Sequence, residues 1–165
     1  MRFERLLPAP VETVWDYLTD PELRRRWFMG GAIDGRPDGS IEFVFDHDRL
    51  SDDDVPIPER YAANKGKSWT ERIVRYEPPH VLAYTFGPGS TSLVTFELKP
   101  AGEGRTLLTL VHGGIADRDQ AAGFGSGWTS HLAVLEARLR GGGVPDFWAL
   151  HRASEGRVAA LLAGA

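Results

Sequence analysis

Two histidines stand where their side chains would face the interior of a folded domain. His131 follows Trp128 by one turn on an apolar stripe with helical spacing, and His112 ends the apolar face of an alternating strand pattern. Because histidine titrates near neutral pH, either ring is chemically able to act as an acid, a base or a polar anchor in a cavity. The alternative is a buried histidine whose hydrogen bonds are satisfied inside the protein, and both interpretations stay open at this point.

A polar loop carries side chains of the kinds that bind metals. Asp46-His47-Asp48 is followed by Ser51-Asp52-Asp53-Asp54. A calcium loop needs a turn glycine and a distal bidentate glutamate at fixed offsets, and this stretch has neither. The chain has no cysteine, which excludes disulfides, thiolate metal sites and a cysteine nucleophile. We therefore expect a solvated acidic loop, no metal site, no cofactor and no assignable catalytic residue.

Three glycines at alternate positions, Gly123, Gly125 and Gly127, lead into the stripe that contains Trp128. A phosphate-binding loop places its glycines directly after a strand, at a helix N-terminus. Here the preceding strand pattern ends near His112 and the spacing is G-x-G-x-G, so a nucleotide site is not predicted. Inside a helix each glycine costs about 1 kcal/mol relative to alanine. Either the helix begins late or is kinked here, or the missing side chains leave a cavity beneath it.

The N-terminal part of the chain predicts a strand and two helices. Residues 2–8 fit a short strand, and Pro10 opens a helix with an apolar stripe at helical spacing. Asp20 caps a second short helix that carries Trp27 and Phe28. The basic run Arg24-Arg25-Arg26 is expected on a solvated face of that helix.

Alternating patterns then predict five antiparallel strands in a meander at residues 41–45, 68–76, 81–86, 92–99 and 106–112, and short turns join the last four of them. Neither face of 68–76 is clean, so its orientation is not predicted. Residues 46–67 form a long polar excursion, which indicates a mobile flap or a local irregular element.

A long helix is predicted from Asp117, which pairs with Gln120 as a capping box, to the glycines at 141–143. The tail after Gly143 fits a further amphipathic helix, interrupted at Gly156.

Composition sets the outer limits on function. The chain has 165 residues, of which 42% are hydrophobic and 25% charged, with a net charge of −4, as expected for one soluble globular domain. A mildly acidic chain lacks the positive charge that nucleic-acid binding requires. No signal-peptide core and no membrane-length apolar run is present, so we expect no membrane association and a cytoplasmic protein.

The order of these elements, with the short motifs between them, resembles the START-like (SRPBCC) superfamily, or helix-grip fold. The branch is the one named after the C-terminal domain of the heat-shock-protein-90 ATPase activator. The likeness covers about residues 1–141 and leaves out the 46–67 excursion and the tail. The motifs that carry it are Pro8-Ala9-Pro10 with Val14-Trp15, residues 18–23 through Trp27-Phe28, Glu77-Pro78-Pro79 with Val81-Leu82, and Gly127-Trp128 before the long helix with Leu132, Leu135 and Leu139.

This resemblance implies an α+β domain whose antiparallel sheet of seven strands, one more than the patterns show, curls around the C-terminal helix. It also implies a hydrophobic cavity between sheet and helix that takes apolar or amphipathic small molecules. We expect residues 1–143 to form the START-like domain and residues 144–165 a helical extension of it. Some members of the superfamily are cyclases, hydrolases or lyases.

The predicted function is therefore the binding of an apolar or amphipathic small molecule. Two alternatives stay open: an enzyme of the polyketide cyclase or hydrolase type with His131 as acid or base, and a co-chaperone-like protein-interaction module that uses the excursion and the tail. The apolar tail needs covering by the domain or by a second copy of the chain, which leaves a homodimer open. The residues predicted to line the cavity are Phe43, Phe45, Tyr84, Phe86, Phe96, Phe124, Gly127, Trp128 and His131.

Overall fold

A single antiparallel sheet forms the centre of the computed structural model, which describes residues 1–87 and 92–164. Within these residues the sheet has six strands in the order β1-β6-β5-β4-β3-β2. Strands β2 to β6 form the predicted meander, and β1 pairs antiparallel with β6. The alternating residue patterns correctly predicted six strands. The seventh strand that the resemblance implies is not found in the described part of the chain. The strands are β1 (Arg2–Leu7), β2 (Ser40–Val44), β3 (Ser68–Glu77), β4 (Val81–Thr85), β5 (Leu93–Pro100) and β6 (Thr106–Gly113).

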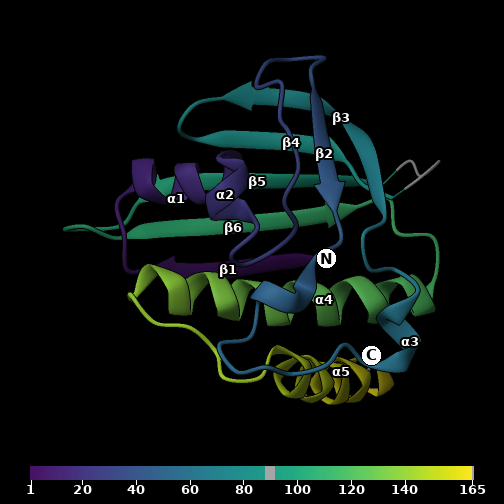
Figure 1. The fold of residues 1–165 in the computed structure, drawn as a ribbon. Coiled ribbons are helices and arrows are strands. Elements are labelled where there is room, and N and C mark those ends of the chain that lie inside the picture. Colours follow the sequence, from purple (N-terminus) through teal and green to yellow (C-terminus); the bar gives the residue numbers. More distant parts are fainter. Residues whose placement is uncertain (88–91, 165) are drawn as a thin grey trace.

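The helices confirm the α+β class. The long helix α4 runs along the sheet beside β1, and α5 packs against α4 on the side away from the strands (Figure 1). Helices α1 and α2 adjoin each other, and α1 contacts β5. The helices are α1 (Val11–Thr19), α2 (Pro21–Arg24), the 3₁₀ turn η1 (His47–Arg49), α3 (Glu59–Ala62), α4 (Arg118–Leu139) and α5 (Phe147–Ala163).

Aspartate side chains cap the N-termini of three of these helices. Asp20 accepts hydrogen bonds from the amides of Glu22 and Leu23 at the start of α2. Asp117 accepts from the amide of Gln120 at the start of α4, as predicted, and Asp146 caps α5 in the same way. Each bond satisfies an amide that has no partner within the helix. At the other end of α4, Gly141 adopts a φ of +80°, a conformation that favours glycine and ends the helix.

The 46–67 excursion has local structure of its own, as expected for a local irregular element. It contains η1 and α3, and it passes beside α4 and α5 (Figure 1). The interruption predicted at Gly156 is wrong, because α5 continues through this residue without a break. A Cβ at Gly156 would meet nothing within 4 Å, so no packing demand accounts for the glycine.

The expectation that Arg24 lies on a solvated helix face is wrong. Arg24 is buried, with only 2% of the residue exposed. The guanidinium donates to the carbonyls of Met29, Gly31 and Glu42 at 2.7–2.8 Å and lies over the Phe43 ring. Burial lowers the pKa of Arg24 to about 10, which still leaves it charged at neutral pH. Arg24 therefore ties the chain after α2 to β2, with one nitrogen, Nη1, left unpaired.

The orientation of β3 was not predicted from the sequence, because a buried carboxylate and a bulge interrupt the alternation of apolar and polar residues along the strand. Glu71 is buried and accepts hydrogen bonds from Thr85 Oγ1 at 2.5 Å and from the amide of Gly87 at 2.7 Å. The pairing with β4 shifts between Ile73 and Arg75. An extra residue in one strand reverses the side on which later side chains fall, so no single face stays apolar along β3.

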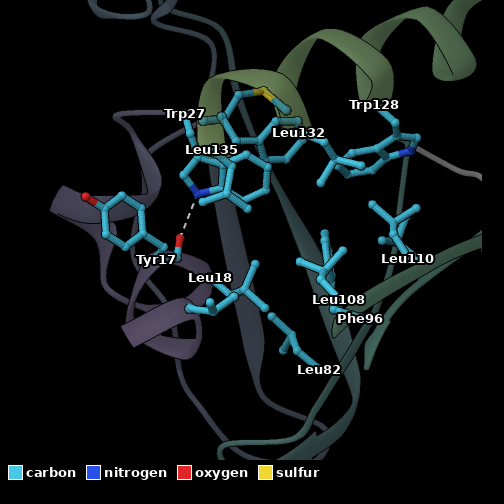
Figure 2. Close-up of a cluster of buried hydrophobic side chains, with 14 of the residues drawn as sticks. Tyr17, Leu18, Trp27, Leu82, Phe96, Leu108, Leu110, Trp128, Leu132 and Leu135 are labelled. Atoms are coloured by element: carbon cyan, nitrogen blue, oxygen red, sulfur yellow. Dashed lines mark hydrogen bonds between the residues drawn. The ribbon is translucent and has the colours of Figure 1, made fainter. Parts of the chain in front are cut away.

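The core fills the space between the sheet and α4 (Figure 2). Phe96, Leu108 and Leu110 point from β5 and β6 toward the helix, on the strand faces predicted to be inward. Trp27 is 1% exposed among them, and its indole donates to the carbonyl of Tyr17 at 2.8 Å. The α4 side of the contact is formed by Trp128, Leu132 and Leu135.

Among the residues described, no helix combines the length and the apolar character needed to cross a membrane.

Candidate functional site: a cavity between the sheet and the two long helices

A cavity of about 710 Å³ lies where the first half of α4, the start of α5 and the 46–67 excursion meet the sheet. Its wall is mainly apolar and strongly aromatic. The lining residues come from the chain after α2 (Phe28, Met29), the residue after β2 (Phe45), the excursion and the start of β3 (His47, Tyr61, Asn64, Lys67, Ser68, Trp69), the chain directly after β4 (Phe86, Gly87), α4 (Gly123, Phe124, Ser126, Gly127, Trp128, His131) and α5 (Phe147, Trp148, His151, Glu155).

The alternating glycines of α4 have two separate effects. All three lie inside a helix that begins at Arg118, so the helix does not begin late. A Cβ at Gly123 or Gly127 would meet nothing within 4 Å, and both residues line the cavity. A Cβ at Gly125 would lie 3.2 Å from Val158 Cγ1, which is tighter than an ordinary contact. Gly123 and Gly127 therefore leave space on the cavity side, while Gly125 lets α5 approach on another side.

Six of the nine residues predicted for the cavity line it: Phe45, Phe86, Phe124, Gly127, Trp128 and His131. The structure places the other three, Phe43, Tyr84 and Phe96, in the packed core, where at most 2% of each is exposed. They point to the correct side of the sheet, but other rings cover them. Phe28 lies against Phe43, and Trp27 lies against Phe96.

Sequence reasoning missed two parts of the wall. Helix α5 supplies Phe147, Trp148, His151 and Glu155, and the excursion supplies His47, Tyr61, Asn64 and Lys67. Neither segment belongs to the pattern that suggested the fold. The available signal was the apolar side of the tail, whose Phe147 and Trp148 need covering and are buried against the domain in the structure.

His131 is a buried, neutral cavity residue with a defined orientation. Its Nδ1 lies 2.8 Å from the carbonyl of Trp27, so this nitrogen carries the proton and donates. The remaining nitrogen, Nε2, is then an unprotonated acceptor. Burial lowers the pKa of His131 to about 3, so the ring stays neutral at physiological pH.

His47 lies next to His131 and is also buried. The His47 and His131 rings are perpendicular with centroids 5.0 Å apart, and the His47 ring also stacks with Phe45 and with Trp148. Burial, and then the neighbouring His131 and His151, hold its pKa well below the usual value. Its Nδ1 is buried without a hydrogen-bond partner in the described chain.

His112 does not line the cavity but anchors one of its walls. The Trp128 indole donates to His112 Nδ1 at 3.0 Å, which places the His112 proton on Nε2, 3.1 Å from Ser92 Oγ. Ser92 in turn donates to the carbonyl of Phe86. Burial lowers the pKa of His112 to about 4, which keeps the ring neutral and able to accept from the indole. His112 is therefore a satisfied core histidine that fixes the orientation of Trp128.

A polar network fastens α3 to α5. Tyr61 Oη lies 3.0 Å from His151 Nε2 and 3.3 Å from Glu155 Oε1, and the Tyr61 ring stacks on Trp148. Arg60 pairs with Glu155 at 2.7 Å, and this bond lowers the pKa of Glu155. Burial lowers the pKa of His151 and raises that of Tyr61, so the pair is neutral near pH 7. Helix α3 thus forms a wall of the cavity that side-chain contacts hold in place.

Ser130 is not a nucleophile in this arrangement. Its hydroxyl lies 3.0 Å from His151 Nδ1 and within hydrogen-bond distance of the carbonyls of Ser126 and Gly127. The side chain is 0% exposed and does not line the cavity. The contact therefore positions His151 and does not place a hydroxyl where a substrate would lie.

Some of the carboxylates in the acidic loop form ion pairs. Asp48 pairs with Lys65, and Asp52 pairs with Arg138 at 2.7 Å. Over the described ranges, no cluster of three or more histidine and carboxylate side chains has a geometry able to hold a metal ion.

Comparison with known proteins gives a family match over most of the chain. Residues 8–140 match the family described as Activator of Hsp90 ATPase homolog 1-like protein. No match was found among curated proteins.

Several solved structures are similar. The solution structure of the protein encoded by gene BPP1335 from Bordetella parapertussis is 39% identical, with a TM-score of 0.82, over 96% of this chain and 84% of that one. The crystal structure of CalU16 from Micromonospora echinospora is 24% identical, with a TM-score of 0.67, over 97% and 85% of the two chains. The Aha1 dimer from Colwellia psychrerythraea is 16% identical, with a TM-score of 0.63, over 84% and 94%. The last two likenesses show a shared fold alone.

Proposed function

The chain belongs to the Activator of Hsp90 ATPase homolog 1-like family, and from that premise we propose that it binds an apolar or amphipathic small molecule in the cavity between the sheet, α4 and α5. The family name refers to an effect on a chaperone, whereas the proposal rests on the site of this chain. Fold-level likeness does not by itself assign a function.

The cavity itself carries the proposal. Its volume of about 710 Å³ falls within the range of small-molecule sites, and its aromatic wall with a few polar groups is typical of them. The glycines support it independently, because Gly123 and Gly127 cost helix stability where a side chain would fill the space. The exposed members of the lining are Lys67, Ser68 and Gly123, so the ligand is expected to enter between the start of β3 and the first turns of α4.

An enzyme that uses His131 as acid or base finds less support. Proton transfer to or from a substrate needs a group with a pKa near the working pH, and the pKa of His131 is about 3. The hydrogen bond that His131 makes within the described residues goes to a backbone carbonyl rather than to a second titratable group. His131 is better suited to orient a bound molecule than to exchange a proton with it.

A neutral fluorescent probe tests the proposal. N-phenyl-1-naphthylamine is expected to bind one molecule per chain with increased emission, and a large excess of another apolar compound should displace it. Native mass spectrometry of the protein purified from its own organism should then show a bound mass that is lost on denaturation. A protein that leaves the probe unbound at concentrations up to its solubility limit would contradict the proposed function.

A further inference from the structure

The cavity has several polar groups, and most of them are already paired within the protein. Both nitrogens of His151 have partners, Ser130 and Tyr61. Ser126 donates to the carbonyl of Ala122. Lys67 donates to Asn64 and is exposed to water at the mouth. These groups can hold the wall together without a ligand.

His131 is different, because it presents an unpaired nitrogen that can only accept a hydrogen bond. Donation from Nδ1 to the Trp27 carbonyl leaves the Nε2 lone pair as the only polar function on the rest of the ring. Nε2 has no hydrogen bond within the described residues and is not sealed among packed atoms, and the residue lines the cavity. The cavity therefore contains a fixed hydrogen-bond acceptor that a ligand donor can reach.

His47 adds a second group that adapts to its partner. It lines the cavity next to His131, and no hydrogen bond within the described residues fixes its proton to one nitrogen. A neutral imidazole carries one N–H and one lone pair, so His47 can present either one. A hydroxyl group, which donates one hydrogen bond and accepts others, matches a fixed acceptor beside an adaptable partner.

We infer that the ligand of this cavity is a neutral, largely apolar molecule with a hydroxyl group, of the phenol or alcohol class, which donates to Nε2 of His131. The inference rests on the proposed function and specifies its ligand. The surroundings of His131 and His47 are aromatic rather than cationic, with Phe28, Phe45, Phe147 and Trp148 in ring contact. A carboxylate placed there would meet a lone pair instead of a positive charge.

A set of naphthalenes of nearly equal shape tests this at pH 7, by displacement of N-phenyl-1-naphthylamine and by calorimetry. 2-Naphthol carries the hydroxyl, 2-methoxynaphthalene carries an oxygen without a donor, naphthalene has neither, and 2-naphthoate is charged. One hydrogen bond to a cavity acceptor corresponds to about a tenfold gain in affinity. We expect 2-naphthol to bind about tenfold more tightly than 2-methoxynaphthalene, and 2-naphthoate to bind most weakly.

The outcomes separate this inference from the proposed function. If naphthalene, 2-naphthol and 2-methoxynaphthalene bind with equal affinity, or if 2-naphthoate binds best, the cavity still binds apolar molecules but the hydroxyl inference is wrong. If none of them displaces the probe, the proposed function fails as well.

His131→Phe tests the residue. This variant is expected to keep its affinity for naphthalene and to lose its preference for 2-naphthol. His80→Phe is the matched control, because His80 also pairs Nδ1 with a backbone carbonyl, that of Leu98, and does not line this cavity. A preference for 2-naphthol that persists in His131→Phe would overturn the assignment.

A second measurement avoids any folding defect of that variant. In the wild-type protein, the ¹⁵N resonances of His131 should show the proton on Nδ1. The Nε2 resonance should move on addition of 2-naphthol and stay in place on addition of 2-methoxynaphthalene. An Nε2 resonance that does not respond to bound 2-naphthol would overturn the inference in the same way.

Discussion

Replacing Gly127 with leucine adds a side chain to the cavity without disturbing what surrounds it. Gly127 lies inside α4 and lines the cavity, and a Cβ there would meet no atom within 4 Å. Gly127→Leu should therefore fold normally and fail to bind the probe. If the glycine were instead required by the backbone of a kinked helix, the same change would destabilise the protein.

The size of the effect follows from helix propensity and burial. Leucine is favoured over glycine in a helix interior by about 0.7 kcal/mol. Partial burial of its four side-chain carbons against the aromatic wall adds to this, up to about 1 kcal/mol. For a domain of this length, the melting temperature should stay the same or rise by about 2–6 °C.

The assay combines thermal unfolding with titration of N-phenyl-1-naphthylamine, and two other glycines serve as controls. Gly156→Leu adds the same side chain to an exposed, open position of α5 away from the cavity, so it should raise stability slightly and retain binding. Gly125→Leu places its Cβ 3.2 Å from Val158 Cγ1. It should lower stability by about 1–3 kcal/mol through overpacking between α4 and α5.

Two results would refute this reasoning. Gly127→Leu would melt many degrees below the wild type if the glycine serves the backbone. It would bind the probe with wild-type affinity if the cavity is not the binding site.

Three further predictions concern residues that hold the site together. Trp128→Ala should lower the free energy of unfolding by about 3–5 kcal/mol, and Trp128→Phe by about 1–3 kcal/mol because His112 Nδ1 loses its donor. Chemical denaturation measures both, and a Trp128→Phe protein as stable as the wild type would count against the network. The pKa values of His112 and His131 are lowered to about 4 and about 3, so the unfolded chain, with histidines near 6.5, takes up protons first as the pH falls. The contribution of these histidines to the free energy of unfolding should be present above pH 6.5. The free energy of unfolding should fall by about 2 kcal/mol per histidine between pH 7 and pH 5. A free energy of unfolding that does not change over that range would contradict the burial of His112 and His131 as neutral rings. Tyr61→Phe removes the hydroxyl that joins α3 to His151 and Glu155 and so loosens one wall of the cavity. Stopped-flow fluorescence should then show faster release of the probe with little loss of stability, and an unchanged rate would mean that these hydrogen bonds do not limit release.

Much of the fold was predictable because its signals are local. The alternation in β5 and β6 shows one apolar face, and the structure buries those faces. The limits of α4 follow from Asp117 and Gly141, whose roles as cap and terminator depend on the chain near each residue. Helix periodicity, strand alternation and capping are properties of short segments, and a sequence shows them directly.

The errors arose where a distant residue decides the outcome. Arg24 stands in a run of three arginines and is buried because three carbonyls, one of them from β2, converge on it. Phe43 and Phe96 were expected on the cavity wall, but rings from the chain after α2 cover them. Side-chain direction follows from strand periodicity, whereas the rings that cover a side chain depend on tertiary packing.

The cavity was half predictable for the same reason. The glycines of α4 indicated open space, but α5 and the excursion, which supply much of the wall, have no position in sequence relative to α4 until the chain is folded. The tautomer of His131 likewise could not be predicted from the sequence, because it depends on the carbonyl of a residue 104 positions away.

The central claim is that an apolar molecule binds inside this cavity, and intermolecular nuclear Overhauser effects test it most directly. With isotope-labelled protein and unlabelled 2-naphthol, ligand protons should show contacts to the rings of Phe86, Phe124 and Trp128, which line the cavity from two sides. Contacts confined to exposed apolar residues on the outside, such as Leu6, Val111 or Leu161, would show that the ligand binds elsewhere and would contradict the account.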